Sequence, residues 1–148
     1  VPDDVPECIL NLIDTMDKSS LCIERGRTGT FYMALGVDGI WKMQYNITND
    51  KITFKKITDG NKTFYRIGLG IGPDGDFLRG LKSIYAAAII DGVYGFYRSD
   101  DDGASWLRIN NDNQMFGQID CICGDARSFG RFYIATGSRG LLYGEPVQ

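Results

Sequence analysis

Three stretches of the chain repeat one pattern of aromatic, small and apolar residues, at residues 32–41, 85–94 and 133–142. Each stretch opens on a tyrosine and has a glycine at its eighth position: Tyr32, Tyr85 and Tyr133, then Gly39, Gly92 and Gly140. The stretches start 53 and 48 residues apart. Strand-rich units that repeat every ~40 to 50 residues are typical of β-propeller blades. The pattern therefore predicts a propeller.

Each repeated stretch also predicts a β-hairpin. Asp-Gly at residues 38–39 and 91–92, and Arg-Gly at 139–140, separate two apolar runs. Asp-Gly between apolar runs favours a tight hairpin, because the turn needs positive φ at its central residues. We therefore assign Asp38 and Asp91 to turns rather than to a pair of catalytic carboxylates.

Strands on either side of the hairpins complete the predicted blades. In the first unit an inner strand is expected near residues 21–24 and an outer strand over 51–57, where three lysines discourage pairing with neighbouring chains. In the second unit residues 65–72 form the inner strand, with glycines at alternate positions that suit the crowded inner end of a blade. Residues 105–109 form its outer strand. The third unit has an inner strand near 118–124 and a hairpin.

The predicted fold class is all-β, a partial β-propeller of about three four-stranded antiparallel blades, the last one incomplete. Propellers close with about 4 to 8 blades, so the sheet faces at both ends need a cover. The expected partners are the remaining propeller blades of a parent polypeptide, or other copies of the chain. The expected boundaries are a lead-in or remnant of a preceding blade at 1–20, blade 1 at 21–60, blade 2 at 61–112 and incomplete blade 3 at 113–148.

One turn of the second unit matches a named motif. The segment S-D-D-D-G-A-S-W at residues 99–106 fits the Asp box, which is Ser/Thr-x-Asp-x-Gly-x-Ser/Thr-Trp. Asp101 is expected to accept backbone N–H groups within the loop, while Trp106 packs inward. We expect Asp100 and Asp102 to point to solvent, and so do not predict a calcium site. The fixed positions are Ser99, Asp101, Gly103, Ser105 and Trp106.

The first unit has a degenerate copy of this turn at residues 46–50, and it contains one of two N-glycosylation sequons. The sequons begin at Asn46 and Asn61, and each is a candidate glycosylation site. Their presence suits a secreted, extracellular or cell-surface protein.

Composition excludes several classes of function. The net charge of -3 offers no basic surface for nucleic acid, and no apolar run approaches the ~18 residues needed to span a bilayer. The chain has no histidine, which removes the commonest general base. We expect no cofactor and no metal site.

Four cysteines, at 8, 22, 121 and 123, suggest one disulfide. Cys8 and Cys22 close a plausible loop, whereas Cys121 and Cys123 share one face of a strand and are poorly placed to pair. The alternative is that all four are free thiols in strands.

The segment at residues 124–146, GDARSFGRFYIATGSRGLLYGEP, resembles the closing segment of glycoside hydrolase family 74 xyloglucanases. That family commonly ends in G-D-P-R-x-x-G-R-x-Y-x-G-T-x-G-R-G-I-x-Y-G-D-P. With the Asp box, the likeness covers roughly residues 85–146. Sortilin-type receptors and sialidases carry Asp boxes (BNR repeats) but not this closing segment. The departures are Ala126 for Pro, Ala135 and Ser138 for Gly, Leu141 for Ile and Glu145 for Asp.

The resemblance implies two tandem seven-bladed propellers with a glucan-binding cleft between them, of which this chain would supply the last blades. The family hydrolyses xyloglucan-like glucans as an inverting endo-glycosidase, with two catalytic aspartates that would lie upstream. No catalytic residue is therefore assigned to this chain. The alternative function is a non-catalytic extracellular propeller for adhesion, a surface coat or filament assembly.

Two sets of side chains could contact a ligand directly. Arg127, Arg131 and Arg139 form a candidate anion site, although we favour a role in tying strand ends and the Asp125 carboxylate together. Trp41 and Tyr94 could stack on a polysaccharide, although aromatic residues at such positions more often belong to the blade core.

Overall fold

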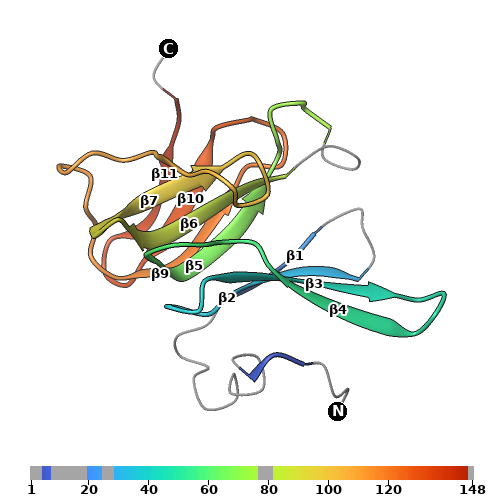
Figure 1. Ribbon diagram of the computed structural model, residues 1–148. Coiled ribbons are helices and arrows are strands. Elements are labelled where there is room, and N and C mark those ends of the chain that lie inside the picture. The colour runs from blue at the N-terminus through green and yellow to red at the C-terminus, as the bar shows by residue number, and fades with distance from the viewer. Residues whose placement is uncertain (1–4, 8–19, 25–28, 77–81, 147–148) are drawn as a thin grey trace.

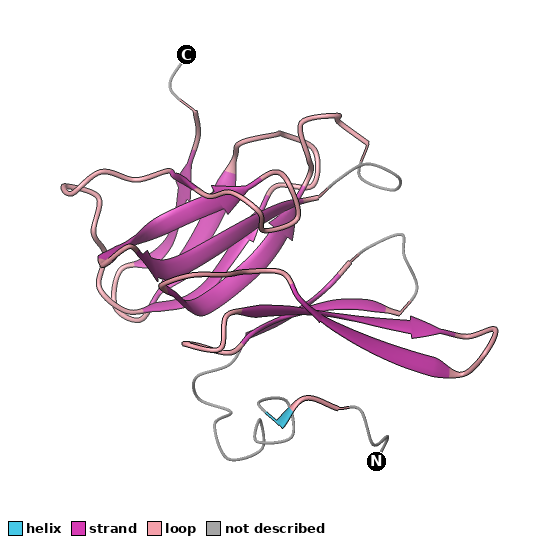
Figure 2. Cartoon of the chain, viewed as in Figure 1, coloured by secondary structure: helices cyan, strands magenta, loops and turns pink. Residues whose placement is uncertain are grey.

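Three antiparallel sheets make up the computed structural model, which describes residues 5–7, 20–24, 29–76 and 82–146 (Figure 1). Strands dominate the described chain (Figure 2), and the predicted all-β class is confirmed. Most of the expected lead-in at 1–20 lies outside the described residues. Sheet 1 contains β1 (Ser20–Ile23), β2 (Thr30–Ala34), β3 (Ile40–Asn46) and β4 (Lys51–Lys56); sheet 2 contains β5 (Lys62–Gly70), β6 (Ser83–Ile90), β7 (Val93–Ser99) and β8 (Leu107–Arg108); sheet 3 contains β9 (Ile119–Gly124), β10 (Phe132–Thr136) and β11 (Gly140–Gly144).

Within each sheet the strands follow one another in sequence order, as in the blade of a propeller. The first strand of each sheet lies next to the first strand of the next sheet, with β5 in contact with both β1 and β9. In the described part of the chain, sheet 3 has three strands where sheets 1 and 2 have four. The division into blades at 21–60, 61–112 and 113–148 stays a prediction.

The three predicted hairpins form, but only the second has the expected two-residue turn. There Asp91 and Gly92 have φ of 51° and 80°, and Ile90 pairs with Val93. In the first hairpin Ala34 pairs with Ile40, which leaves a five-residue loop. The third has a three-residue loop, since Thr136 pairs with Gly140.

Two predicted strands differ from the structure. The outer strand expected at 105–109 is shorter and contains only the two residues of β8, because the preceding turn extends to Trp106. The inner strand expected at 65–72 begins earlier, at Lys62, and ends at Gly70. It carries a bulge between Phe64 and Arg66.

The core consists of two apolar layers, one between sheets 1 and 2 and one between sheets 2 and 3. β6 contributes to both layers through alternate residues. Ile84, Ala86 and Ala88 face sheet 1, whereas Tyr85 and Ala87 face sheet 3. This two-sided burial explains the unbroken apolar run of β6.

The glycines expected to suit a crowded inner strand do so at two positions of β5. A Cβ on Gly68 would lie 2.0 Å from the backbone oxygen of Ile122 in β9, and one on Gly70 would lie 2.7 Å from the Cα of Gly124. Both distances are shorter than any real contact, so the backbones of β5 and β9 can approach this closely only without side chains.

Equivalent faces of the three sheets differ in how well they are covered. Tyr32 and Ala34 of sheet 1 are 3% and 0% exposed beneath sheet 2, and Tyr85 is 1% exposed beneath sheet 3. The same face of sheet 3 carries Leu141 and Tyr143, which are 71% and 68% exposed. In the described chain this face is therefore covered in sheets 1 and 2 and exposed in sheet 3.

Candidate functional site

The turn at residues 99–106 is closed by its own side chains. Asp101 accepts hydrogen bonds from the Ser99 hydroxyl (2.8 Å), from the Ser105 backbone N–H (2.8 Å) and from the Ser105 hydroxyl. The Ser99 hydroxyl oxygen in turn accepts the Gly103 N–H at 2.9 Å. The hydrogen bonds from Ser105, first its hydroxyl and then its backbone, lower the pKa of Asp101. Four of the five residues predicted from the motif therefore hydrogen-bond to one another within the turn, and the fifth, Trp106, follows directly after Ser105.

Trp106 and Gly103 join this turn to the layer between sheets 1 and 2. The Trp106 Nε1 donates to the Gly103 carbonyl at 3.1 Å, and its ring centroid lies 4.9 Å from that of Phe64. Gly103 has a φ of 91°, and a Cβ there would lie 3.0 Å from the Ile57 carbonyl oxygen. Glycine is required for both reasons.

The expectation that Asp100 and Asp102 point to solvent is wrong. Asp102 accepts a hydrogen bond from the Tyr32 hydroxyl at 2.8 Å and pairs with the Lys42 ammonium at 3.0 Å, both in sheet 1. Burial, followed by the nearby Asp102 charge, raises the pKa of Tyr32. A motif does not specify its variable positions, so the sequence carried no signal for this contact between sheets.

Asp100 is also bound, within its own sheet. It accepts a hydrogen bond from the Ser83 hydroxyl at 2.6 Å and pairs with Arg98 at 3.1 Å. The Arg98 guanidinium in turn lies 4.5 Å from the ring centroid of Phe129. Each of the three consecutive aspartates thus binds its own pair of residues, and their carboxylates do not share a partner.

A second polar cluster ties the strand ends of sheet 3 together. The Asp125 carboxylate accepts the backbone N–H groups of Arg127 (2.7 Å) and Ser128 (3.0 Å) and the Tyr133 hydroxyl (2.8 Å). These hydrogen bonds lower the pKa of Asp125, and the one from the Arg127 backbone has the largest effect. Arg131 lies 3.9 Å from Asp125 and forms an ion pair with Glu145.

Of the three arginines in the candidate anion site, Arg131 takes the predicted tying role through its guanidinium. Arg127 contributes its backbone N–H, and the Arg139 N–H donates to the Thr136 hydroxyl oxygen at 2.8 Å. Arg139 lies in the turn between β10 and β11, at the opposite end of β10 from Arg131, so the three arginines do not form one cluster.

The two aromatic candidates are partly exposed. Trp41 donates from Nε1 to the Asp38 carbonyl at 3.1 Å. Tyr94 lies 6.4 Å, ring centroid to centroid, from Tyr65, which is 38% exposed, and 6.5 Å from Phe96. Neither Trp41 nor Tyr94 is a fully buried core residue.

The sequon asparagines lie on the surface, whereas Cys22 is half-buried. Asn46 and Asn61 are exposed, and the Asn46 side-chain oxygen accepts the Thr48 N–H at 2.9 Å. Burial raises the pKa of the Cys22 thiol to about 12, and its expected partner Cys8 lies outside the described residues. The disulfide stays a prediction.

The described residues contain no group of three or more His, Cys, Asp or Glu side chains placed to hold a metal ion. In the same residues, no helix has the length and apolar character to cross a membrane. The carboxyl groups there whose pKa is shifted are Asp59, Asp101 and Asp125, and each is lowered.

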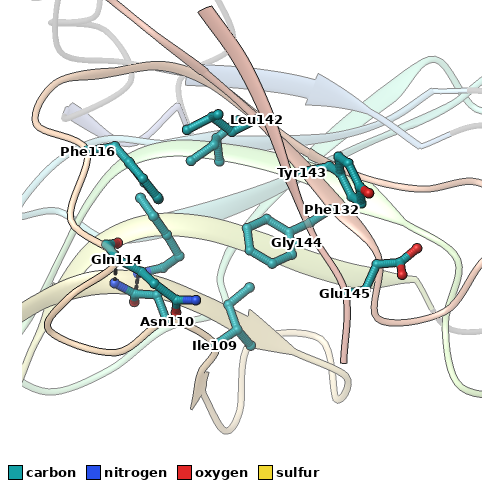
Figure 3. Close-up of a pocket in the computed structure, with 11 residues that line it drawn as sticks. Ile109, Asn110, Gln114, Phe116, Phe132, Leu142, Tyr143, Gly144 and Glu145 are labelled. Carbon is teal, nitrogen blue, oxygen red and sulfur yellow. Dashed lines mark hydrogen bonds between the residues drawn. The ribbon is translucent and has the colours of Figure 1, made fainter. Parts of the chain in front are cut away.

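A cavity of about 310 Å³ lies between the outer parts of sheets 2 and 3 (Figure 3). Its apolar wall includes Phe96, Phe116, Phe132 and Leu142. Polar groups reach it from the loop after β8, through Asn110 and Gln114, and from Glu145 beyond β11.

Comparisons with known proteins agree on one group of relatives. No protein-family model matches the chain. A xyloglucanase of a Paenibacillus species is 40% identical over 112 residues, which is 76% of this chain. Xyloglucanase Xgh74A of Acetivibrio thermocellus is 46% identical over 87 residues, or 57% of the chain. The crystal structure of the GH74 xyloglucanase from Xanthomonas campestris matches 87% of the chain with a TM-score of 0.74 and 32% identity.

These relatives are much longer than the chain. It spans 10% of the length of the two curated xyloglucanases and 17% of the Xanthomonas chain.

Proposed function

The chain is a β-propeller segment similar to the glycoside hydrolase family 74 xyloglucanases, and from this premise we propose that it serves a secreted protein that binds or hydrolyses xyloglucan. The catalytic carboxylates of that protein would lie on other segments. The sequence similarity over 76% of the chain to a protein named xyloglucanase carries the proposal.

Two carboxyl groups of the described chain, Asp101 and Asp125, are poor candidates for the catalytic acid, which fits the proposal that the catalytic carboxylates lie on other segments. An inverting glycosidase needs a carboxylic acid with a raised pKa and, about 6.5 to 9.5 Å away, a carboxylate base. Asp101 and Asp125 have lowered pKa values because each accepts several hydrogen bonds. Such groups stay ionised and cannot supply the proton that the leaving sugar needs.

We further infer that the turn at 99–106 is an Asp box of the BNR type, with an architectural role. The hydrogen bonds around Asp101 support this assignment. The exposure of Asn46 and Asn61 supports glycosylation in a host that carries out that modification. Both inferences fit a secreted protein.

The test uses the intact parent protein that contains this chain. Incubation with tamarind-type xyloglucan should release new reducing ends, and the protein should be retarded by xyloglucan in an affinity gel. A gel with an unrelated polysaccharide such as mannan controls for nonspecific binding. Absence of both hydrolysis and retardation would refute the proposal.

A non-catalytic extracellular propeller is the second candidate. The exposed apolar side chains of sheet 3, Leu141 and Tyr143, would supply the surface for the polypeptide partner that this candidate requires. Under this alternative the parent protein would neither bind nor cleave xyloglucan, but would copurify with a polypeptide partner.

A further inference from the structure

Tyr65 lies at the β-bulge of β5. Phe64 pairs with Ala88 of β6 and Arg66 pairs with Ala87, so Tyr65 is the extra residue between them. Phe64 is fully buried, whereas Tyr65 is 38% exposed. A bulge redirects the side chains beside it, and bulges are frequent next to functional sites. The irregularity in β5 therefore turns one aromatic ring out of the core.

Backbone contacts from both neighbouring sheets hold the bulge in place. The Phe64 N–H donates to the Gly36 carbonyl and the Gly36 N–H donates to the Phe64 carbonyl, both at 3.0 Å. The Arg66 guanidinium donates to the Tyr65 carbonyl at 2.8 Å and to the carbonyl of Asp120, in β9, at 3.1 Å. The backbone of Tyr65 is thus already ordered, which reduces the entropy that binding a ligand would cost.

Tyr94 of β7 lies beside Tyr65 at the same end of sheet 2. The two ring centroids are 6.4 Å apart and the ring planes are inclined at 54°. Tyr94 packs edge-on against Phe96 at 6.5 Å, and its hydroxyl donates to the Gly117 carbonyl at 3.5 Å. Tyr94 is therefore anchored in the layer between sheets 2 and 3, while Tyr65 next to it is open to solvent.

Polar groups border the two rings on the side of sheet 3. Gln118 and Asp120 are both exposed, and the Gln118 side-chain amide donates to the Asp120 carboxylate at 3.4 Å. Gln118 follows Gly117, which accepts the Tyr94 hydroxyl, and Asp120 accepts the Arg66 guanidinium through its carbonyl. An exposed amide beside an exposed carboxylate disfavours an anionic ligand and suits hydroxyl groups, which both donate and accept hydrogen bonds.

The two rings are exposed although sheet 2 has a neighbouring sheet on each side. β5 contacts both β1 and β9. The close approach of β5 to β9 uses Gly68 and Gly70, further along the strand. Within the described chain, neither Tyr65 nor Tyr94 belongs to the two buried clusters between the sheets. The exposed aromatic surface is therefore a property of a blade that is flanked on both sides.

A β-linked glucan has the chemistry that this surface fits. Each pyranose ring carries C–H groups on its two faces and hydroxyl groups around its edge. The C–H faces stack on the electron-rich faces of aromatic rings, and the hydroxyl groups bind amides and carboxylates. Rings 6.4 Å apart can contact neighbouring sugar units of one extended chain. An α-linked glucan coils, so its successive sugar faces point in different directions and fit less well.

We propose that Tyr65 and Tyr94 form a stacking surface for a β-linked glucan chain, with the side chains of Gln118 and Asp120 as hydrogen-bonding partners of its hydroxyl groups. This inference rests on the proposed function, since it names the part of the chain that would touch the polysaccharide. Tyr65 stacks on one sugar unit and Tyr94 contacts the next. The surface contributes affinity and takes no part in bond cleavage.

Affinity electrophoresis of the intact parent protein tests the two rings. Its retardation in gels that contain increasing amounts of tamarind-type xyloglucan gives a dissociation constant. Tyr65→Ala removes the exposed ring and should weaken binding at least about fivefold. Tyr65→Phe keeps the ring and should bind within about twofold of the parent protein. Tyr94→Leu keeps an apolar contact with Phe96 but removes the aromatic face, so it should also weaken binding at least about fivefold.

Tyr45→Ala is the matched control. Tyr45 is 37% exposed, nearly as much as Tyr65, but it lies at the far end of its strand, next to the turn at 46–50. This variant should bind as the parent protein does. Circular dichroism checks that each variant is folded, and the exposed substitution Gln118→Ala, with an expected loss of at least about twofold, replaces Tyr65→Ala if the latter does not fold.

Parallel gels with hydroxyethylcellulose, an unbranched β-linked glucan, and with soluble starch, an α-linked glucan, separate this inference from the proposed function. Retardation by xyloglucan that is equal in the parent protein, Tyr65→Ala and Tyr94→Leu would overturn the stacking surface and leave the proposed function intact. Retardation by hydroxyethylcellulose alone, lost in Tyr65→Ala, would support the surface and refute a xyloglucan-specific function. Tyrosine-dependent retardation by starch would contradict the β-linked assignment, and no retardation by any β-linked glucan would refute both proposals.

Discussion

Replacing Asp102 by alanine should weaken the contact between sheets 1 and 2. Its carboxylate accepts the Tyr32 hydroxyl and pairs with Lys42, so it crosses from sheet 2 to sheet 1. Tyr32 is 3% exposed and cannot turn to water without opening the layer. Asp102 also holds a φ of 57°, which aspartate and asparagine tolerate better than alanine.

The expected cost for Asp102→Ala is about 3 kcal/mol of unfolding free energy. Loss of a hydrogen bond to a charged acceptor contributes about 1.5 to 2 kcal/mol, and alanine in the left-handed region adds about 1 kcal/mol. The Lys42 pair contributes less than about 1 kcal/mol, since the ammonium can move to solvent. Asp102→Gly removes the strain and should cost about 2 kcal/mol. Asp102→Asn keeps an acceptor and the backbone preference and should cost about 1 kcal/mol.

Urea denaturation followed by tryptophan fluorescence measures these differences, because Trp106 lies in the same turn. A double-mutant cycle with Tyr32→Phe should give a coupling energy of about 1 to 2 kcal/mol. A coupling near zero, or an alanine variant no less stable than the asparagine variant, would refute the reasoning.

Three further predictions concern single side chains. Trp106→Ala should lower the unfolding free energy by about 2 to 3 kcal/mol in the same urea assay, toward the low end for a buried aromatic because its ring is only partly buried. Gly68→Ala should lower the unfolding free energy by about 2 kcal/mol, because the added Cβ would meet the β9 backbone. In the control Gly137→Ala the added Cβ would have no neighbour nearer than 3.7 Å, so the unfolding free energy should fall by less than about 1 kcal/mol. The folded pKa values of Asp101 and Asp125 are lowered, so the stability that these carboxylates contribute is complete above the unfolded pKa of about 3.9 and is lost as the pH falls below it. Between about pH 5 and 2.5, the urea midpoint should therefore fall less steeply with pH in Asp101→Asn and Asp125→Asn than in the parent chain. Equal slopes would contradict this prediction.

The elements that local sequence determines could be predicted. Asp91-Gly92 forms the expected turn because both residues adopt positive φ without help from the rest of the chain. The pattern of β6 predicts a buried strand because both of its faces are apolar. The self-closing contacts of Asp101 follow from the motif itself.

Contacts between distant parts of the chain could not be predicted from a single sequence. The first hairpin has a longer loop than expected, and Gly36 in that loop exchanges two backbone hydrogen bonds of 3.0 Å with Phe64 in sheet 2. That pairing favours a loop conformation that Asp38-Gly39 alone does not specify. Asp102 is a similar case, since its partners lie sixty and seventy residues away along the chain.

The glycines of β5 have a consequence for the geometry of the whole ring. Adjacent sheets form a wedge, whose angle depends on how closely the inner strands approach relative to the outer ones. Gly68 and Gly70 bring β5 against β9, while Phe96 and Phe132 hold the outer parts of the same two sheets apart. A large angle between adjacent sheets closes the ring with few blades, and a small angle requires more blades. The placement of small residues on inner strands and large ones further out therefore helps to set how many blades one turn of the propeller contains.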